Sequence, residues 1–204
     1  MSESGNNRQS TESELLEFCL SDSLSKKGLR EIIERYEIIQ WTGLAPHDRV
    51  NDYQFFFEAC INKRVTVGII RYLLEYFPDS IRATDEQGGS PIHYACSNPN
   101  VTLNIIQLLI DAAPDSVRSE DYNSWTPLHC FCDSTNEDDR KAMQSLKLLI
   151  EKCPEAIRRA DNNGFLPFHY ACAESSPELC RLLIEAYPGS ERITAANGML
   201  PLHF

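Results

Sequence analysis

Basic residues are scarce in this sequence, and long apolar runs are absent. The 204 residues include 19 Lys and Arg against 30 Asp and Glu, which gives a formal net charge of −11. A chain with this much negative charge is repelled by phosphate backbones and by anionic lipid. Nucleic acids and membrane surfaces are therefore poor partners for it. The longest apolar stretches, such as that at 105–110, fall far short of the ~18 residues that a membrane-spanning helix requires.

Signals for secretion and for the commoner catalytic sites are absent as well. Residues 1–13 have neither a basic start nor an apolar stretch, so they predict a disordered tail rather than a secretory signal. The sequence contains no phosphate-binding glycine loop, no nucleophile elbow and no His-Glu-x-x-His pair. We therefore predict a protein that is not an enzyme and that uses neither a cofactor nor a small-molecule substrate.

The sequence has eight cysteines but no Cys-x-x-Cys pair. An even count suits the disulfide framework of a small secreted domain, yet this chain is neither small nor marked for secretion. We therefore expect eight reduced thiols in a protein of the cytoplasm or the nucleus. A zinc site could begin at His129, Cys130 and Cys132, but a structural zinc needs four ligands, so we predict no bound metal.

The sequence repeats itself. Four of its five histidines follow a proline by two residues within similar segments: His93, His129, His169 and His203. A second series of prolines precedes these histidines by 15 residues in every unit: Pro78, Pro114, Pro154 and Pro188. From a histidine to the next proline of this series the distance varies from 19 to 25 residues. A constant spacing indicates a loop held by its neighbours, and a variable spacing indicates a free surface connection.

Each unit has the pattern of two helices. A proline, preceded in two units by Ser90 or Thr126, suits the start of the first helix, and apolar residues at helical spacing form one face of the second. The second helix ends at the next proline, after which residues rich in Asp, Asn and Gly predict a turn. We expect an all-α solenoid with no strand longer than a hairpin tip, and with helix pairs at 54–77, 90–113, 126–153 and 166–187.

These segments resemble the ankyrin-repeat family, whose signature is Thr-Pro-Leu-His-x-Ala in units of about 33 residues. Thr126-Pro127-Leu128-His129 matches the signature, and the segments around the other three histidines match it with substitutions. The resemblance implies an ankyrin-repeat solenoid of stacked helix–loop–helix units with short β-hairpin turns. Its units would span about 51–84, 85–120, 121–160 and 161–194, with a truncated unit at 195–204.

The two ends of the chain carry further expectations. Residues 14–50 lack the repeat, but four apolar residues share one helical face, which predicts a helical N-terminal cap: Leu29, Ile32, Ile33 and Tyr36. The last residue, Phe204, follows a repeat histidine directly, whereas a solenoid normally ends in a polar capping repeat. We therefore expect the sequence to be a fragment of a longer protein.

The resemblance also implies candidate binding residues, because ankyrin repeats contact partners through their hairpin tips and the residue after the histidine. Carried over residue by residue, the candidates are Tyr94, Tyr122, Asn123, Trp125, Asn162, Asn163, Phe165 and Tyr170. Aromatic residues at surface positions favour partner binding, above all at Tyr122, Trp125 and Tyr170. The alternative, in which the rings pack on the neighbouring hairpin as Trp125 would on Phe165, stays open.

Four other columns repeat with the units. The histidines could be general bases, but the resemblance implies that His93, His129, His169 and His203 fix their turns by hydrogen bonds. Cysteines at the position three residues further predict packing against the neighbouring helix: Cys60, Cys96, Cys132 and Cys172. An arginine column and an aspartate column predict rows of exposed ion pairs: Arg82, Arg118, Arg158 and Arg192 beside Asp85, Asp121 and Asp161. The alternative for the arginines is a ladder that binds an acidic partner.

We therefore predict a monomeric protein–protein interaction scaffold that binds a partner protein, whose identity the sequence does not give, through hairpin tips and the concave helix face. The alternative function is that of a regulatory or targeting ankyrin segment of a larger enzyme, truncated at the C-terminus.

Overall fold

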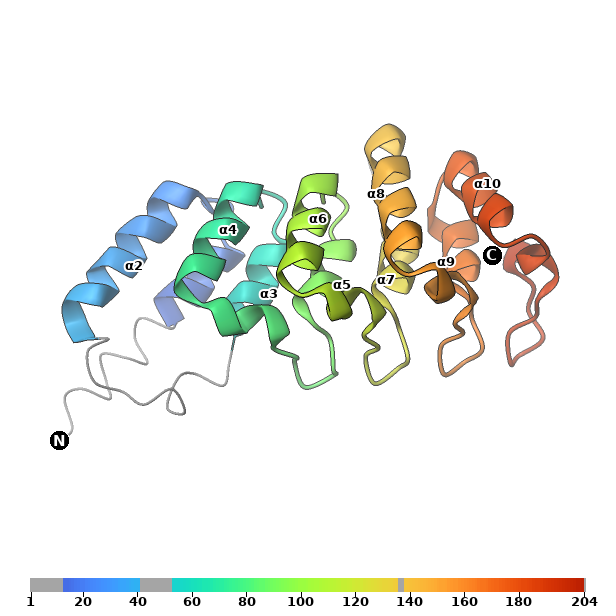
Figure 1. Ribbon diagram of the computed structural model, residues 1–204, viewed down its shortest axis with the longest axis horizontal. Coiled ribbons are helices and arrows are strands. Elements are labelled where there is room, and N and C mark those ends of the chain that lie inside the picture. Colours follow the sequence, from blue (N-terminus) through green and yellow to red (C-terminus); the bar gives the residue numbers. More distant parts are fainter. Residues whose placement is uncertain (1–12, 41–52, 136–137, 204) are drawn as a thin grey trace.

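The computed structural model describes residues 13–40, 53–135 and 138–203, without the side chains of 35–40. These residues form an elongated stack of helix pairs, and the chain runs from one end of the stack to the other (Figure 1). The predicted tail, apart from residue 13, lies outside the described residues, as do residues 41–50 of the predicted cap and Phe204. The domain boundaries drawn from the sequence therefore stay predictions.

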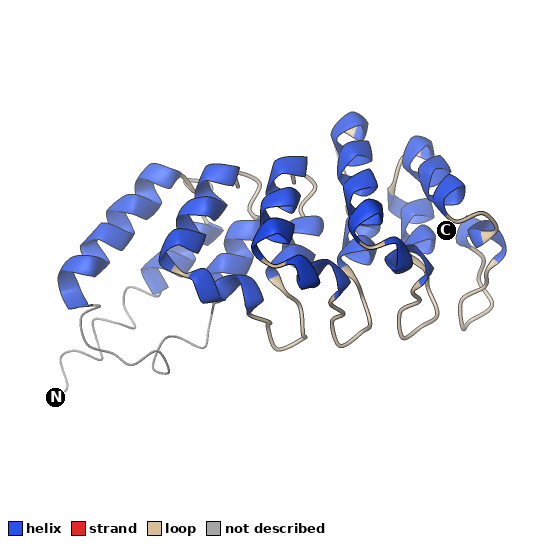
Figure 2. Ribbon diagram, viewed as in Figure 1, coloured by secondary structure: helices blue, strands red, loops and turns tan. Residues whose placement is uncertain are grey.

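Every helix pair expected from the repeat is present, and the all-α architecture is confirmed. The pairs are α3 (Gln54–Ile61) with α4 (Val67–Tyr76), α5 (Pro91–Cys96) with α6 (Leu103–Ala112), α7 (Pro127–Asp133) with α8 (Asp139–Lys152), and α9 (Pro167–Glu174) with α10 (Pro177–Ala186). No strand occurs within the described ranges, so the hairpin turns are loops (Figure 2).

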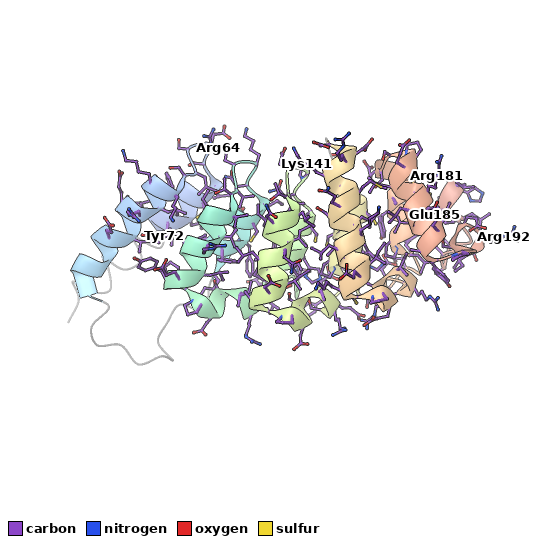
Figure 3. All side chains as sticks on the ribbon, turned by 45° about the horizontal axis from the view of Figure 1, so that its top comes forward. Arg64, Tyr72, Lys141, Arg181, Glu185 and Arg192 are labelled. Atoms are coloured by element: carbon purple, nitrogen blue, oxygen red, sulfur yellow. The ribbon has the colours of Figure 1, made fainter. Side chains whose placement is uncertain are left out.

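The paired helices lie in two layers. α3, α5, α7 and α9 form an inner row, α4, α6, α8 and α10 form an outer row, and the loops between units project to one side (Figure 1). Charged side chains such as Lys141 of α8 and Arg181 and Glu185 of α10 extend from the outer row (Figure 3). None of the helices in the described part of the chain is both long and apolar enough to cross a membrane.

Local sequence signals place the helix starts. Proline occupies the first turn of α5, α7 and α9, where its missing N–H has no helical partner to lose. Thr66 caps α4, since its Oγ1 accepts a hydrogen bond from the Ile69 N–H at 3.3 Å. Asp138 caps α8 in the same way, accepting from the backbone N–H groups of Arg140 and Lys141.

The second series of prolines does more than end a helix. Each of three prolines begins a five-residue 3₁₀ turn: η2 (Pro78–Arg82), η3 (Pro114–Arg118) and η4 (Pro154–Arg158). The apolar residue three positions after each proline is buried: Ile81, Val117 and Ile157. These turns were not predicted from the sequence. The loop between units is therefore held at both ends, by the buried 3₁₀ turn at one end and by the start of the next helix at the other. A loop held in this way cannot change length, which accounts for the constant 15 residues from each proline to the next histidine.

One continuous core runs the length of the stack. Its largest fully buried side chains include Phe56, Phe131 and Phe168, one from each of three inner helices. A column of cysteines follows the inner row, in which the predicted members Cys60, Cys96 and Cys132 are buried while the fourth, Cys172, is half-buried. Cys19, which the repeat did not identify, is buried at the head of the same column.

The N-terminal residues form a helix pair of their own rather than a single helix. A helix at 13–20 precedes α2 (Lys26–Gln40), and α2 packs against α4. Three of the residues predicted to face the core, Leu29, Ile32 and Ile33, are buried, while the side chain of Tyr36 lies outside the described residues. Tyr72 on α4 lies beside this pair (Figure 3), and the Lys26 ammonium sits 5.7 Å from its ring centroid.

Candidate functional site

The loops that carry most of the candidate residues are closed by aspartates. In the last of these loops, Asp161 Oδ1 accepts hydrogen bonds from the backbone N–H groups of Asn163 at 2.8 Å and Phe165 at 2.9 Å. Asp85 and Asp121 make the equivalent bonds to their own loops. The predicted pairing of this column with arginine is therefore wrong, because a short side chain reaches its own turn first. Arg118 instead pairs with Glu155 of the next unit at 3.0 Å.

Neighbouring loops are joined through their backbones. The N–H of Tyr122 donates to Gln87 O at 2.8 Å, and the N–H of Asn162 donates to Asn123 O at 3.0 Å. The loop turns on a residue with positive φ, which is Gly88 or Gly164 in two units and Ser124 in the unit between them. A Cβ on Gly164 would lie 2.7 Å from the backbone nitrogen of Ala196, so the next loop packs directly on this glycine. The tips therefore form one connected row.

The histidines link each unit to the next. His129 Nδ1 accepts from the Thr126 N–H at 3.1 Å, which leaves Nε2–H to donate to Phe165 O of the following unit at 3.2 Å. His93 makes the same bonds to Ser90 and to Trp125 O. Burial lowers the pKa of both imidazoles, to about 4 for His129, so both are neutral at pH 7. With both ring nitrogens engaged inside the protein, neither ring is placed to act on a substrate.

The two remaining histidines of the column differ in their surroundings. His169 is buried, accepts from the Leu166 N–H at 3.0 Å, and has its pKa lowered chiefly by burial. His203 accepts from the Leu200 N–H at 3.0 Å and is exposed. As the sequence indicates, leucine supplies no hydroxyl in these two units, whereas Ser90 and Thr126 place theirs 2.8 and 2.9 Å from the corresponding Nδ1.

Three of the aromatic candidates gather around Asp161. Tyr170 donates its hydroxyl to Asp161 Oδ2 at 2.6 Å, and the Trp125 indole N–H donates to the same oxygen at 3.2 Å. The rings of Trp125 and Tyr170 lie 4.6 Å apart, and Phe165 meets the Tyr170 ring edge-on at 5.9 Å. Burial alone raises the pKa of Asp161, but hydrogen bonds from Tyr170 and from the loop N–H groups reverse the effect and lower it.

Tyr94 repeats part of this arrangement. Its hydroxyl donates to Asp85, and its ring stacks on Phe57 with centroids 5.0 Å apart. Burial and the Asp85 carboxylate raise the pKa of this phenol, as the corresponding contacts do for Tyr170. In the unit between them Cys130 takes the place of the tyrosine. Packing on the neighbouring unit, one of the two alternatives for the rings, is thus present at Trp125, which bonds to Asp161 of the next loop and meets the ring of Tyr170 on α9.

The eight candidate residues divide into two sets. Four are exposed at the tips: Tyr122, Asn123, Asn162 and Asn163. Tyr122 is the extreme case, with 71% of its surface exposed. Four are half-buried beneath the tips: Tyr94, Trp125, Phe165 and Tyr170. Asn162 stiffens the row, since its side-chain amide donates to Tyr122 O at 2.9 Å and its oxygen accepts from the Ser124 hydroxyl at 2.8 Å.

The thiols offer a separate test of the fold. Six of the eight are buried, while Cys172 and Cys180 are half-exposed. Burial raises the pKa of the Cys19 and Cys130 thiols to about 12, which suppresses their reactive thiolate forms. Among the described residues, no three His, Cys, Asp or Glu side chains are grouped to hold a metal ion.

We therefore expect no more than two thiols to react with Ellman's reagent in the native protein at pH 7.5, and all eight to react after denaturation. Thiol titration with and without guanidinium measures both values. Rapid native reaction of four or more thiols would show that the cysteine column is not buried, and fewer than eight after denaturation would show a pre-existing disulfide.

Comparison with known proteins gives a single answer. A family model for ankyrin repeats in three copies matches residues 100–197, and a second for ankyrin repeats in many copies matches residues 56–110. No curated protein matches the chain. The matched span of 56–197 contains the four helix pairs, the aspartate-closed loops and the histidine bridges described above, apart from the first two residues of α3. The chain belongs to the ankyrin-repeat family.

Proposed function

We propose that this protein is an interaction scaffold that binds a partner protein through its hairpin tips and the adjoining face of the inner helices. Ankyrin repeats are generally protein-interaction modules, which supports this class of function. The observation that carries the proposal for this chain is Tyr122, a large aromatic side chain that is 71% exposed on a tip whose backbone is hydrogen-bonded on both sides.

Tyr122, at the tip of its loop, has the properties of a residue that anchors a binding partner. A tyrosine presents an apolar ring and a hydroxyl with few rotatable bonds, so its burial by a partner costs little entropy. The Tyr122 backbone is already fixed by its bonds to Gln87 and Asn162, which lowers that cost further. Asn123 and Asn163 flank it with exposed amides, which donate and accept hydrogen bonds without carrying charge.

The half-buried rings support the tips from below. Trp125 and Tyr170 are each bonded to Asp161, so they hold the loop while leaving part of each ring at the surface. We include both rings in the proposed binding surface, as the part that lies beneath the tips, and we include Tyr94 and Phe165 at its edges. The overall charge of −11 favours a neutral or basic surface on the partner.

The proposal extends to the catalytic role, the oligomeric state and the compartment of the protein. We infer a non-catalytic monomer of the cytoplasm or nucleus. The buried neutral histidines support the non-catalytic role, and the free cysteines support a reducing compartment. No feature of the described residues favours the alternative of a regulatory segment within a larger enzyme.

The test places a photo-crosslinking amino acid at position 122. As a control, the same amino acid is placed at position 187, the residue that caps the C-terminus of α10. We expect position 122 to capture a protein that position 187 does not. Tyr122→Ala should then weaken the purified interaction by roughly tenfold to a hundredfold, the range of an aromatic anchor, without changing the melting temperature. Tyr187 packs on Arg158, so Tyr187→Ala tests whether a change away from the tips has any effect. If Tyr122→Ala binds as wild type, the tips are not the binding surface.

A further inference from the structure

Two of the cysteines form a pair on the last helix unit. Cys172 lies on α9 and Cys180 in the first two turns of α10, and these helices pack against each other. A hydrogen bond between the two thiols is the leading cause of the pKa shift at each of them. Cys180 is also held against the backbone of α9, because its Sγ lies 3.3 Å from Ala171 O. The two cysteines are eight residues apart, and Cys180 Sγ lies against the carbonyl of the residue directly before Cys172, so little movement is needed to form a bond between the sulfurs.

This pair differs from the other thiols in its access to solvent. Cys19, Cys60, Cys96, Cys130, Cys132 and Cys153 are all buried, whereas Cys172 and Cys180 are half-exposed. A small oxidant in solution therefore reaches these two first. Cys132 is the nearest competing thiol, but only 1% of its surface is exposed.

The hydrogen bond between the thiols gives them unequal roles. Donation from Cys172 lowers the pKa of Cys180, and the same bond raises the pKa of Cys172. Cys180 also lies near the N-terminus of α10, where the helix dipole favours an anion. Cys180 is thus the thiol that ionises first and attacks the oxidant, and Cys172 is the thiol that then reacts with the oxidised Cys180.

We propose that Cys172 and Cys180 are a peroxide-sensitive site that closes to an intramolecular disulfide. The Cys180 thiolate attacks hydrogen peroxide, so that an S–O bond forms, the O–O bond breaks and hydroxide leaves to become water. Cys172 then attacks the sulfenic sulfur of Cys180, so that the S–S bond forms, the S–O bond breaks and a second water leaves with the Cys172 proton. Both cysteines are oxidised and the peroxide is reduced to two waters.

The sequence makes the product simple to detect. Trypsin leaves both cysteines in one peptide, 160–181, since no Lys or Arg lies between Ala160 and Arg181. The whole protein is treated with a small excess of hydrogen peroxide, quenched, unfolded in iodoacetamide and digested. We expect this peptide to lose two hydrogens and to carry no alkyl group, and to regain two alkylation sites after reduction. Oxidation here should be at least roughly tenfold faster than at Cys153, which lies in the peptide 153–158.

Two matched variants assign the roles. In Cys172→Ser, dimedone should trap a sulfenic acid on Cys180, because the partner thiol is missing. In Cys180→Ser, Cys172 should remain alkylatable through the same exposure. Circular dichroism spectra like those of wild type show that both variants are folded.

Several outcomes would overturn the proposal. These are full alkylation of peptide 160–181 after peroxide, a disulfide to Cys132 instead, or equal peroxide sensitivity of Cys172 and Cys180 in the single variants. Protein oxidised after unfolding serves as the reference, since all eight thiols are exposed there and only loop length decides which of them pair.

Discussion

Asp161→Ala is expected to lower the free energy of unfolding by about 3–5 kcal/mol. The carboxylate accepts bonds from the backbone N–H groups of Asn163 and Phe165, from the Trp125 indole and from the Tyr170 hydroxyl. Each donor left unsatisfied in a part-buried site costs about 1 kcal/mol or more. Urea denaturation at pH 7, followed by circular dichroism, measures the change.

The chain supplies its own control for this substitution. Asp121 makes the same two backbone bonds, but Cys130 stands where Asp161 meets Tyr170. Asp121→Ala should therefore cost about 1–2 kcal/mol, and Asp161→Asn, which keeps an acceptor for the backbone, a similar amount. Equal losses for Asp161→Ala and Asp121→Ala would show that the aromatic contacts to Asp161 contribute nothing to stability.

Lowering the pH from 7 to 5 is expected to remove about 2 kcal/mol of stability through His129 alone. Burial lowers its folded pKa to about 4 against ~6.5 in the unfolded chain, and the nearby carboxylates of Asp161, Asp121 and Glu120 only partly offset this. Because the unfolded state binds the proton more readily, the stabilisation is complete above pH 6.5 and is lost as the pH falls toward 4. His93 and His169 act in the same direction.

Substitution separates this effect from general acid sensitivity. His129→Gln should be less stable at pH 7 by about 2–3 kcal/mol, since it breaks the bonds to Thr126 and Phe165. It should also show a smaller loss between pH 7 and 5, measured by urea denaturation at each pH. His203→Gln, at an exposed site, should match wild type in both respects. An unchanged pH dependence in His129→Gln would refute the account of His129 as a buried neutral bridge.

The helices and the histidine column could be predicted because their determinants are local. A proline two residues before a histidine, a helical apolar face and a fixed interval all lie within one unit, so the sequence displays them directly. Cys19 was missed for the opposite reason. Its unit lacks the proline and histidine, and only the packing of the helix at 13–20 brings it into the cysteine column.

The aspartate column shows a local determinant that was misread. Asp85, Asp121 and Asp161 repeat in step with an arginine column, which suggested ion pairs between exposed side chains. The Oδ1 atom of each aspartate instead lies 2.7–2.9 Å from N–H groups two and four residues further along. A bond to the residue's own turn fixes fewer side-chain torsions than a bond to a long arginine, so it wins at the surface.

The sequence by itself determined the all-α repeat, the outer limits of its four helix pairs and the family, since these follow from patterns within about 33 residues. Only the tertiary structure decided which aromatic candidates face solvent. Tyr122 and Trp125 are three residues apart in one loop, yet Tyr122 is exposed while Trp125 bonds to Asp161 and stacks on Tyr170 of the next unit. The Trp125 ring is held by partners that lie more than 30 residues away in the sequence and that only the stacking of the units brings close to it.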